Sequence, residues 1–285
     1  MSATSSASWA SPAGPRRRST RSNESSSPAT SEPAGGRAPD GSRGHRPAIV
    51  FVHATRLTGA QWASQVADLS ADFLCLAPDL PGHGAAAGVP FTLAAAAEGI
   101  GELIERETPD GRAIVVGLSL GAYVAMDVAA RWPDRVAGLV LAGSTAEPRG
   151  PRSLLFRALA GVYGWTPERW LVRGETWTFR RGYPADVSDP ILRDGFNHRA
   201  GAVAVRALLG ESFRPRLARY PGPTLLLNGQ RDLLFRAGAR SFAAAAASPR
   251  RVVIRGAGHR SNLDRPGAFS AVVRAFATEV SAAAD

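Results

Sequence analysis

The chain has 285 residues, 45% of them hydrophobic and 20% charged, which is enough for one sizeable core rather than two full domains. Its single cysteine and the lack of an obvious metal-ligand cluster argue against a disulfide framework and a zinc site. No apolar run is long enough to span a bilayer or to form the core of a signal peptide, so we expect no membrane partner and a cytoplasmic protein.

The formal net charge of +10 raises the question of a nucleic-acid partner. The basic excess is confined to two stretches, residues 1–46 with +4 and residues 149–216 with +6, and the rest of the chain sums to zero. Neither stretch is a recognisable nucleic-acid-reading element. We therefore expect no nucleic-acid partner.

Residues 1–46 are rich in Ser, Pro, Gly and Arg and contain almost no periodic apolar positions. Such a segment buries too little surface to offset the entropy of ordering, so we predict a disordered tail.

From residue 47 onward, short apolar runs alternate with helical patterns, which predicts an α/β fold with a mostly parallel, doubly wound sheet covered on both faces. The predicted strands are 48–52, 73–77, 113–116, 136–142, 224–227 and 252–254, and the predicted helices are 60–69, 92–107, 120–132, 236–247 and 266–281. A long, partly helical segment, 146–220, interrupts this alternation. The core is then 47–145 together with 221–285.

The stretch from Val115 to Tyr123 predicts a buried strand that turns sharply into a helix at Ser119. A serine at the tip of such a turn needs a positive φ, which is tolerated when its neighbours are small. Gly117 and Gly121 meet that need, and the G-x-S-x-G pattern in this context is typical of a nucleophile elbow.

Two further strand-end loops carry Asp232 and His259. In an open α/β sheet, reactive residues lie at the carboxyl ends of the strands. A serine hydroxyl needs an imidazole to accept its proton, and the imidazole needs a carboxylate to fix its tautomer. We therefore predict Ser119, Asp232 and His259 as catalytic residues.

These features resemble the alpha/beta-hydrolase superfamily over roughly residues 47 to 281, and by that resemblance 146–220 is a helical cap. The segments that carry the resemblance are Val52-His53-Ala54-Thr55, Asp79-Leu80-Pro81-Gly82-His83-Gly84, Gly117-Leu118-Ser119-Leu120-Gly121, and Gly229-Gln230-Arg231-Asp232 with Gly258-His259.

The resemblance implies an oxyanion hole made by the backbone N–H groups of Thr55 and Leu120. It also reveals two departures. Ala54 stands where the family usually has glycine, and its methyl group is expected to shift the loop and weaken the second oxyanion donor. The edge strands that often precede the first parallel strand are missing.

Three other histidines have different expected roles. We interpret His53 and His83 as loop-structuring residues, because each belongs to a turn segment of the family. His198 lies in the predicted cap, where cap packing and substrate contact are the alternatives.

Two other acidic residues also need an interpretation. Glu147 follows the strand ending at Ala142 and is the alternative triad acid, although the context of Asp232 fits better. Asp264 precedes Arg265-Pro266 and is expected to cap the last helix.

The sequence therefore predicts a serine hydrolase that cleaves an ester-like bond of a small, largely apolar substrate through an acyl-enzyme intermediate, without a cofactor. Alternatives on the same residues are a cofactor-free perhydrolase, a carbon-carbon bond hydrolase, a lyase or acyltransferase, and a non-catalytic ligand-binding relative. The sequence does not indicate an oligomeric state. The aromatic content and positive charge of the cap favour short to medium acyl or aryl esters, with anionic substrates tolerated and cationic ones disfavoured.

Overall fold

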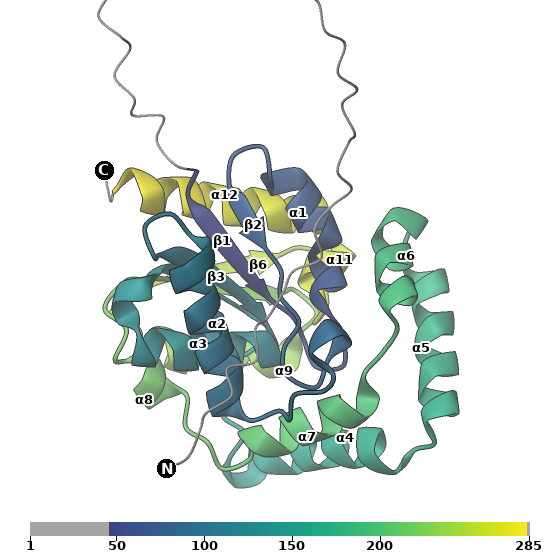
Figure 1. Ribbon diagram of the computed structural model, residues 1–285. Helices are drawn as coiled ribbons and strands as arrows, with labels where there is room; N and C mark the ends of the chain where they lie inside the picture. Colours follow the sequence, from purple (N-terminus) through teal and green to yellow (C-terminus); the bar gives the residue numbers. More distant parts are fainter. Residues whose placement is uncertain (1–45, 284–285) are drawn as a thin grey trace, which may run out of the picture. The chain divides into compact units, whose positions relative to one another are not determined.

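A computed structural model describes residues 46–283, in which six strands form one parallel sheet in the order β2-β1-β3-β4-β5-β6 (Figure 1). The predicted parallel α/β sheet is confirmed. Apart from Arg46, the predicted disordered tail lies outside the described residues. The strands are β1 (Ala48–Val52), β2 (Leu74–Leu76), β3 (Ala113–Leu118), β4 (Val136–Ala142), β5 (Pro223–Gly229) and β6 (Ser248–Ile254).

The central strands are apolar throughout because both faces of the sheet are buried. In β1, Ile49 and Phe51 pack into one hydrophobic cluster, whereas Val50 and Val52 pack into the cluster on the other face. Helices α1 and α12 contribute to the first cluster, and α2 and α3 contribute to the second (Figure 1). These helices are α1 (Ala63–Leu69), α2 (Leu93–Glu107), α3 (Leu120–Arg131) and α12 (Pro266–Ala282).

One predicted helix is wrong. Instead of a single helix over 236–247, the chain forms two short ones, α9 (Leu233–Arg236) and α10 (Ala239–Ala243). They are separated by Gly238, where a Cβ atom would lie 1.7 Å from the carbonyl oxygen of Thr145. The helix is interrupted where these two backbone segments approach each other closely, and no local sequence pattern predicts that approach.

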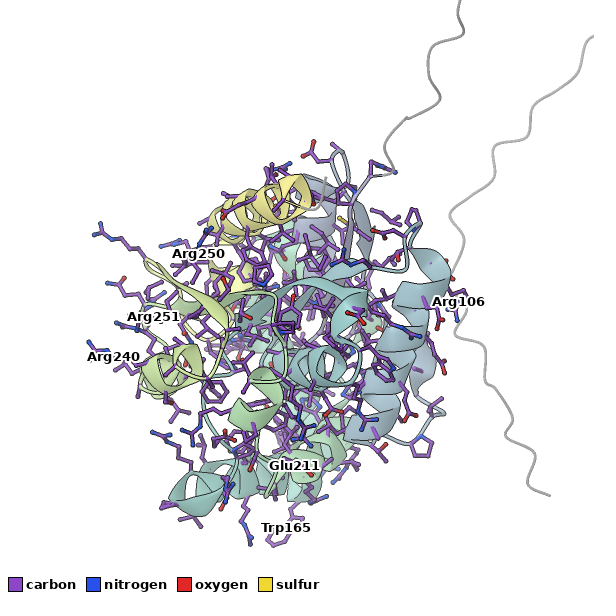
Figure 2. All side chains as sticks on the ribbon, turned by 90° about the vertical axis from the view of Figure 1, so that its left-hand side faces the viewer. Arg106, Trp165, Glu211, Arg240, Arg250 and Arg251 are labelled. Atoms are coloured by element: carbon purple, nitrogen blue, oxygen red, sulfur yellow. The ribbon has the colours of Figure 1, made fainter. Side chains whose placement is uncertain are left out.

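Strand β6 is longer than predicted. The prediction missed its first half because that half carries no apolar pattern. It is the last strand of the sheet, and most of its side chains are exposed. Arg250 and Arg251 project from it, and Arg240 projects nearby from α10 (Figure 2). Arg250 forms a bidentate ion pair with Glu279 of α12, at 2.8 and 2.7 Å. Charged side chains of this kind discourage pairing of an edge strand with another chain.

The segment between β4 and β5 contains five α-helices, preceded by a short 3-10 helix (Gly150–Arg152) (Figure 1). Helix α4 packs along α7, α5 contacts α6, α6 also contacts the core at α1, and α8 contacts α3. We propose 146–220 as the extent of this helical cap, and 47–145 with 221–285 as the core. The cap helices are α4 (Ser153–Trp165), α5 (Glu168–Gly182), α6 (Ala185–Asp194), α7 (His198–Leu208) and α8 (Arg214–Leu217).

The aromatic residues of the cap divide between its interior and its outer surface. Trp165, Trp170 and Trp177 are exposed, and Figure 2 shows Trp165 projecting away from the body of the protein. Tyr163 and Phe179, by contrast, are buried. The tryptophans therefore contribute less to packing than the cap's composition suggests.

We expect Gly121→Ala to destabilise the fold, because a Cβ atom there would lie 2.0 Å from the carbonyl oxygen of Val52. A backbone atom cannot give way as a flexible side chain does, so the loss should be about 1 to 3 kcal/mol or more. Gly161→Ala in α4 is the matched control, since nothing lies within 4 Å of its Cβ position. It should stabilise the protein by about 0.5 to 1 kcal/mol. Chemical denaturation of both variants tests this, and equal midpoints would contradict it.

Candidate active site

Ser119 lies on the turn between β3 and α3, with φ 55° and ψ −115°. The predicted positive φ is therefore confirmed. Its backbone N–H donates to the carbonyl of Ala142 at 2.8 Å, which fastens the turn to the end of β4. The residue is partly exposed and directly follows the carboxyl end of β3.

The two glycines around Ser119 are required by backbone packing. A Cβ atom on Gly117 would lie 2.4 Å from the backbone of Gly121, and one on Gly121 would lie 2.0 Å from the carbonyl oxygen of Val52. The turn is thus pressed between the start of α3 and the end of β1. The pattern predicted small neighbours, and the structure gives the reason as contact between backbones.

His259 and Asp232 form a hydrogen-bonded pair. The distance from His259 Nδ1 to Asp232 Oδ2 is 2.9 Å. The Asp232 side chain is only 6% exposed and the His259 side chain is 38% exposed. Phe235 stacks on the imidazole with a centroid distance of 4.8 Å and an interplanar angle of 25°. A buried carboxylate therefore holds one ring nitrogen, and a stacked ring limits rotation of the imidazole.

Gly143, which the sequence reasoning missed, makes room for this pair. It follows β4 with φ 55°, and a Cβ atom there would lie 3.0 Å from Cε1 and Nδ1 of His259 and 3.4 Å from Oδ2 of Asp232. Any side chain would therefore press against the pair. A glycine directly after the apolar run of β4 was the available signal.

The register of the sheet brings these residues to one edge. Leu118 in β3 pairs with Ala142 in β4, Ala142 pairs with Leu227 in β5, and Gly229 pairs with Ile254 in β6. Ser119, Gly143, Asp232 and His259 follow these strand ends. Because all the strands are parallel, the loops after them meet on the same side of the sheet.

Thr55 and Leu120, whose backbone N–H groups are predicted to form an oxyanion hole, belong to neighbouring segments. Leu120 begins α3, and Thr55 is buried in the loop after β1, which α3 approaches closely at Gly121. Ala54 does not have a positive φ, and its N–H donates to Gln61 Oε1 at 2.8 Å. The alanine at this position is therefore not held in the left-handed region that would require glycine.

His53 is a buried structural residue. Its Nε2 accepts a hydrogen bond from the Leu80 N–H at 2.9 Å, so Nδ1 carries the proton and donates to the Ala54 carbonyl at 2.9 Å. Burial, assisted by neighbouring His83, lowers the pKa of His53 to about 3. His83 is also buried, its Nδ1 lies 2.9 Å from the Pro81 carbonyl oxygen, and burial lowers its pKa. Both contact the backbone of the loops they brace, as predicted.

His198, at the start of α7, lies inside the cap. It is fully buried, and its Nδ1 lies 2.7 Å from Glu168 Oε1. Its ring packs at 5.7 Å from both Tyr163 and Phe196. The structure thus favours cap packing over direct substrate contact for this residue.

Glu147 has hydrogen-bond partners other than His259. It accepts hydrogen bonds from the backbone N–H groups of Phe213 and Arg214, both at 2.9 Å. It also pairs with the Arg214 guanidinium at 3.2 Å. Glu147 therefore fastens the start of α8 rather than orienting an imidazole.

The expected cap role of Asp264 is wrong. Arg265 precedes α12, and Asp264 instead ends the short helix α11 (Ser261–Asp264). Its carboxylate accepts hydrogen bonds from the Gly258 N–H at 2.6 Å and from the Tyr183 hydroxyl at 2.8 Å. Asp264 braces the loop that carries His259, a tertiary role that helix-capping rules do not address.

A parallel sheet with a serine on a strand-to-helix turn, and an Asp–His pair on the loops of later strands, defines the alpha/beta-hydrolase fold. The chain belongs to this family: residues 49–272 match the family model described as Alpha/beta hydrolase family. It is an enzyme of that fold.

Several relatives are named as esterases. The chain is 31% identical over 270 residues to a pimeloyl-[acyl-carrier protein] methyl ester esterase of Xanthomonas oryzae pv. oryzae, covering 83% of this chain and 97% of that protein. It is similar to the structure of a thermophilic esterase from Thermogutta terrifontis, with a TM-score of 0.70, 26% identity, and coverage of 83% and 91%.

Other matches are partial. The chain is 45% identical over 93 residues to the Neisseria meningitidis pimeloyl-[acyl-carrier protein] methyl ester esterase, which covers 31% of this chain and 34% of that protein. It also matches protein PHYLLO of Arabidopsis thaliana at 29% identity over 112 residues, 36% of this chain and 6% of that protein. The chain thus spans about a third or less of these relatives.

Within residues 46–283, no group of three or more His, Cys, Asp or Glu side chains is arranged to hold a metal ion. In the same part of the chain, no helix combines the length and apolar character needed to cross a membrane.

We expect the His53 imidazole to stay neutral from pH 8 to pH 5, because its pKa is about 3. An unfolded chain protonates this histidine near pH 6.5, so the free energy of unfolding should fall as the pH is lowered from 6.5 toward 3. The pKa of His53 is measured by NMR titration of its ring signals, which are identified by their absence from the spectrum of His53→Gln. A titration midpoint above pH 5 would contradict the buried, doubly bonded imidazole.

Proposed function

We propose that this enzyme is a serine carboxylic ester hydrolase in which Ser119 is the nucleophile. The Ser119 oxygen attacks the ester carbonyl carbon, and its proton passes to Nε2 of His259. The tetrahedral intermediate collapses, the carbon–oxygen bond to the alcohol breaks, and His259 delivers the proton to the departing alcohol. Water then attacks the acyl-enzyme with the same assistance, releasing the acid and free Ser119.

The remaining residues support these steps. Asp232 accepts from Nδ1 of His259, which exposes Nε2 as the base and stabilises the imidazolium that forms. The backbone N–H groups of Thr55 and Leu120 would stabilise the oxyanion, an effect worth about 3 to 4 kcal/mol for one donor in a well-studied protease. The observation that carries the proposal is the hydrogen-bonded Asp232–His259 pair at the sheet edge that also carries the Ser119 turn.

The relatives support the choice of an ester over other carbonyl substrates. Two sequence relatives that cover 80% and 83% of the chain are named as pimeloyl-[acyl-carrier protein] methyl ester esterases, and the Thermogutta structure is also named as an esterase. We infer that the substrate is a small molecule in which a carboxylic acid is esterified to a small alcohol.

Replacing Ser119 tests the proposal directly. Ser119→Ala should leave the thermal midpoint nearly unchanged while hydrolysis of a chromogenic short-chain ester falls by several orders of magnitude, because such residues act as a unit. A fluorophosphonate probe should label the wild-type protein and not the variant. Retention of more than a tenth of wild-type turnover would refute the assignment of the nucleophile.

Two matched substitutions separate the acids. Asp232→Asn should lower kcat by about a thousandfold or more, because the imidazole loses the carboxylate that fixes its tautomer. Glu147→Gln should change turnover little, but should lower the free energy of unfolding by about 1 to 3 kcal/mol, because it removes one of the acceptors for the start of α8. The reverse pattern of turnover would move the triad acid to Glu147.

A further inference from the structure

Two arginines follow directly after residues of the candidate site. Arg56 comes after Thr55 and Arg260 after His259, and both side chains reach Glu175 on cap helix α5. Arg56 Nε lies 2.8 Å from Glu175 Oε1, and Arg260 Nη1 lies 3.9 Å from Glu175 Oε2. Neither arginine is fully exposed. Two catalytic loops and the cap therefore converge on one carboxylate.

Both guanidinium groups lie on a row of aromatic rings lining the cap. The Arg56 guanidinium lies 5.4 Å from the Tyr163 ring centroid. The Arg260 guanidinium lies 4.9 Å from the Phe179 ring and 5.3 Å from the Tyr183 ring. Such contacts hold a cation in a defined orientation while leaving its N–H edge available. The row runs through Tyr163, His198, Phe196, Phe179 and Tyr183, with neighbouring rings 5.3 to 5.7 Å apart.

The arginines have more donor capacity than the neighbouring side chains use. Each guanidinium carries five N–H donors. Among the described residues, Arg56 makes one side-chain hydrogen bond, through Nε to Glu175. The Nη1 atom of Arg260 is buried and has no hydrogen-bond partner within residues 46–283. The nearest carboxylate oxygen, Glu175 Oε2, lies 3.9 Å away and is too distant for a hydrogen bond, so a ligand that supplies a closer acceptor gains energy on binding.

The other charged groups nearby are already engaged. Asp264 accepts from Tyr183 and from the Gly258 N–H, and Glu168 lies 2.7 Å from the His198 ring. Glu175 pairs with both Arg56 and Arg260. A planar group with two acceptor oxygens matches the fork of a guanidinium, which makes a carboxylate the chemical group of best fit.

We propose that Arg56 and Arg260 form a subsite for a carboxylate carried by the acyl part of the substrate. This inference rests on the proposed function. The proposed substrates are monoesters of dicarboxylic acids. The ester group lies at Ser119, and the free carboxylate accepts a hydrogen bond from Arg260 Nη1. Glu175 keeps the two arginines together, and it competes with the substrate carboxylate for them.

The test compares two esters that differ only in the end of the acyl chain. The mono-4-nitrophenyl ester of glutaric acid ends in a carboxylate, and 4-nitrophenyl valerate ends in a methyl group. The full chain should hydrolyse the anionic ester with a kcat/KM about tenfold or more above the neutral one, the size of one charge-assisted hydrogen bond. Succinate and adipate monoesters then measure the preferred spacing between the two ends.

Single substitutions assign the preference to the arginines. Arg260→Gln should lower the anionic-to-neutral ratio of kcat/KM by about tenfold or more, and Arg56→Gln should lower it as well. Arg181→Gln is the control, with the same change of charge on α5, the helix that carries Glu175, but beside the exposed Trp177, and it should leave the ratio unchanged. Glu175→Gln should raise kcat/KM for the anionic ester, because the competing carboxylate is gone.

The outcomes separate the subsite from the proposed function. If the wild-type protein hydrolyses neither ester, the proposed function fails. If it hydrolyses the neutral ester with equal or greater kcat/KM, the subsite alone is overturned. Equal loss of activity on both esters in Arg260→Gln and Glu175→Gln would show that the cluster only fastens α5 to the core. If Arg260→Gln does not fold, the wild-type protein still provides a test. Its anionic-to-neutral ratio of kcat/KM should fall as salt is raised from about 0.05 to 0.5 M. A salt-independent ratio would refute the subsite.

Discussion

The positive φ of Ser119 depends on three backbone segments that meet without side chains between them. Gly117, Gly121 and the end of β1 lie so close together that a single methyl group at either glycine would overlap a backbone atom. The hydrogen bond from the Ser119 N–H to the Ala142 carbonyl fastens the same turn to β4. The strain at one residue is therefore distributed over a sheet whose central strands are fully buried. These contacts restrict the conformation of the Ser119 turn.

The loops around the candidate site are held by polar groups that do no proposed chemistry. His53 joins the loops after β1 and β2 through two hydrogen bonds to the backbone, and its burial keeps it neutral. Asp264 holds the loop of His259, and Gly143 leaves room for the Asp232–His259 pair. Each of these contacts restricts one loop, either by a hydrogen bond or by close packing against a neighbouring segment. Precise placement of reacting groups requires support of this kind.

The positive charge of the cap has a more specific location than its composition suggests. Many cap arginines are exposed, and two form cation–π contacts with the exposed Trp170 and Trp177. The two arginines of the proposed subsite, Arg56 and Arg260, come instead from core loops, and their side chains contact Glu175 and the aromatic row of the cap. A charge on an exposed helix face is largely screened, whereas a partly buried guanidinium with an unused donor is not. The electrostatic preference of the enzyme should therefore depend on these two side chains.

The sequence alone determined the parallel α/β sheet, five of the six strands to within two residues of their ends, and the turn at Ser119, because apolar runs and glycine spacing are local signals. It also predicted Asp232 and His259 from the strand ends that precede them. Only the tertiary structure decided the break at Gly238, the start of β6, the bracing by Asp264, and the meeting of Arg56 with Arg260. Each of these depends on segments that lie far apart in the chain and come into contact only when the sheet is assembled. The periodicity of apolar residues predicts which face of a helix or strand is buried, but not which side chains pack against that face.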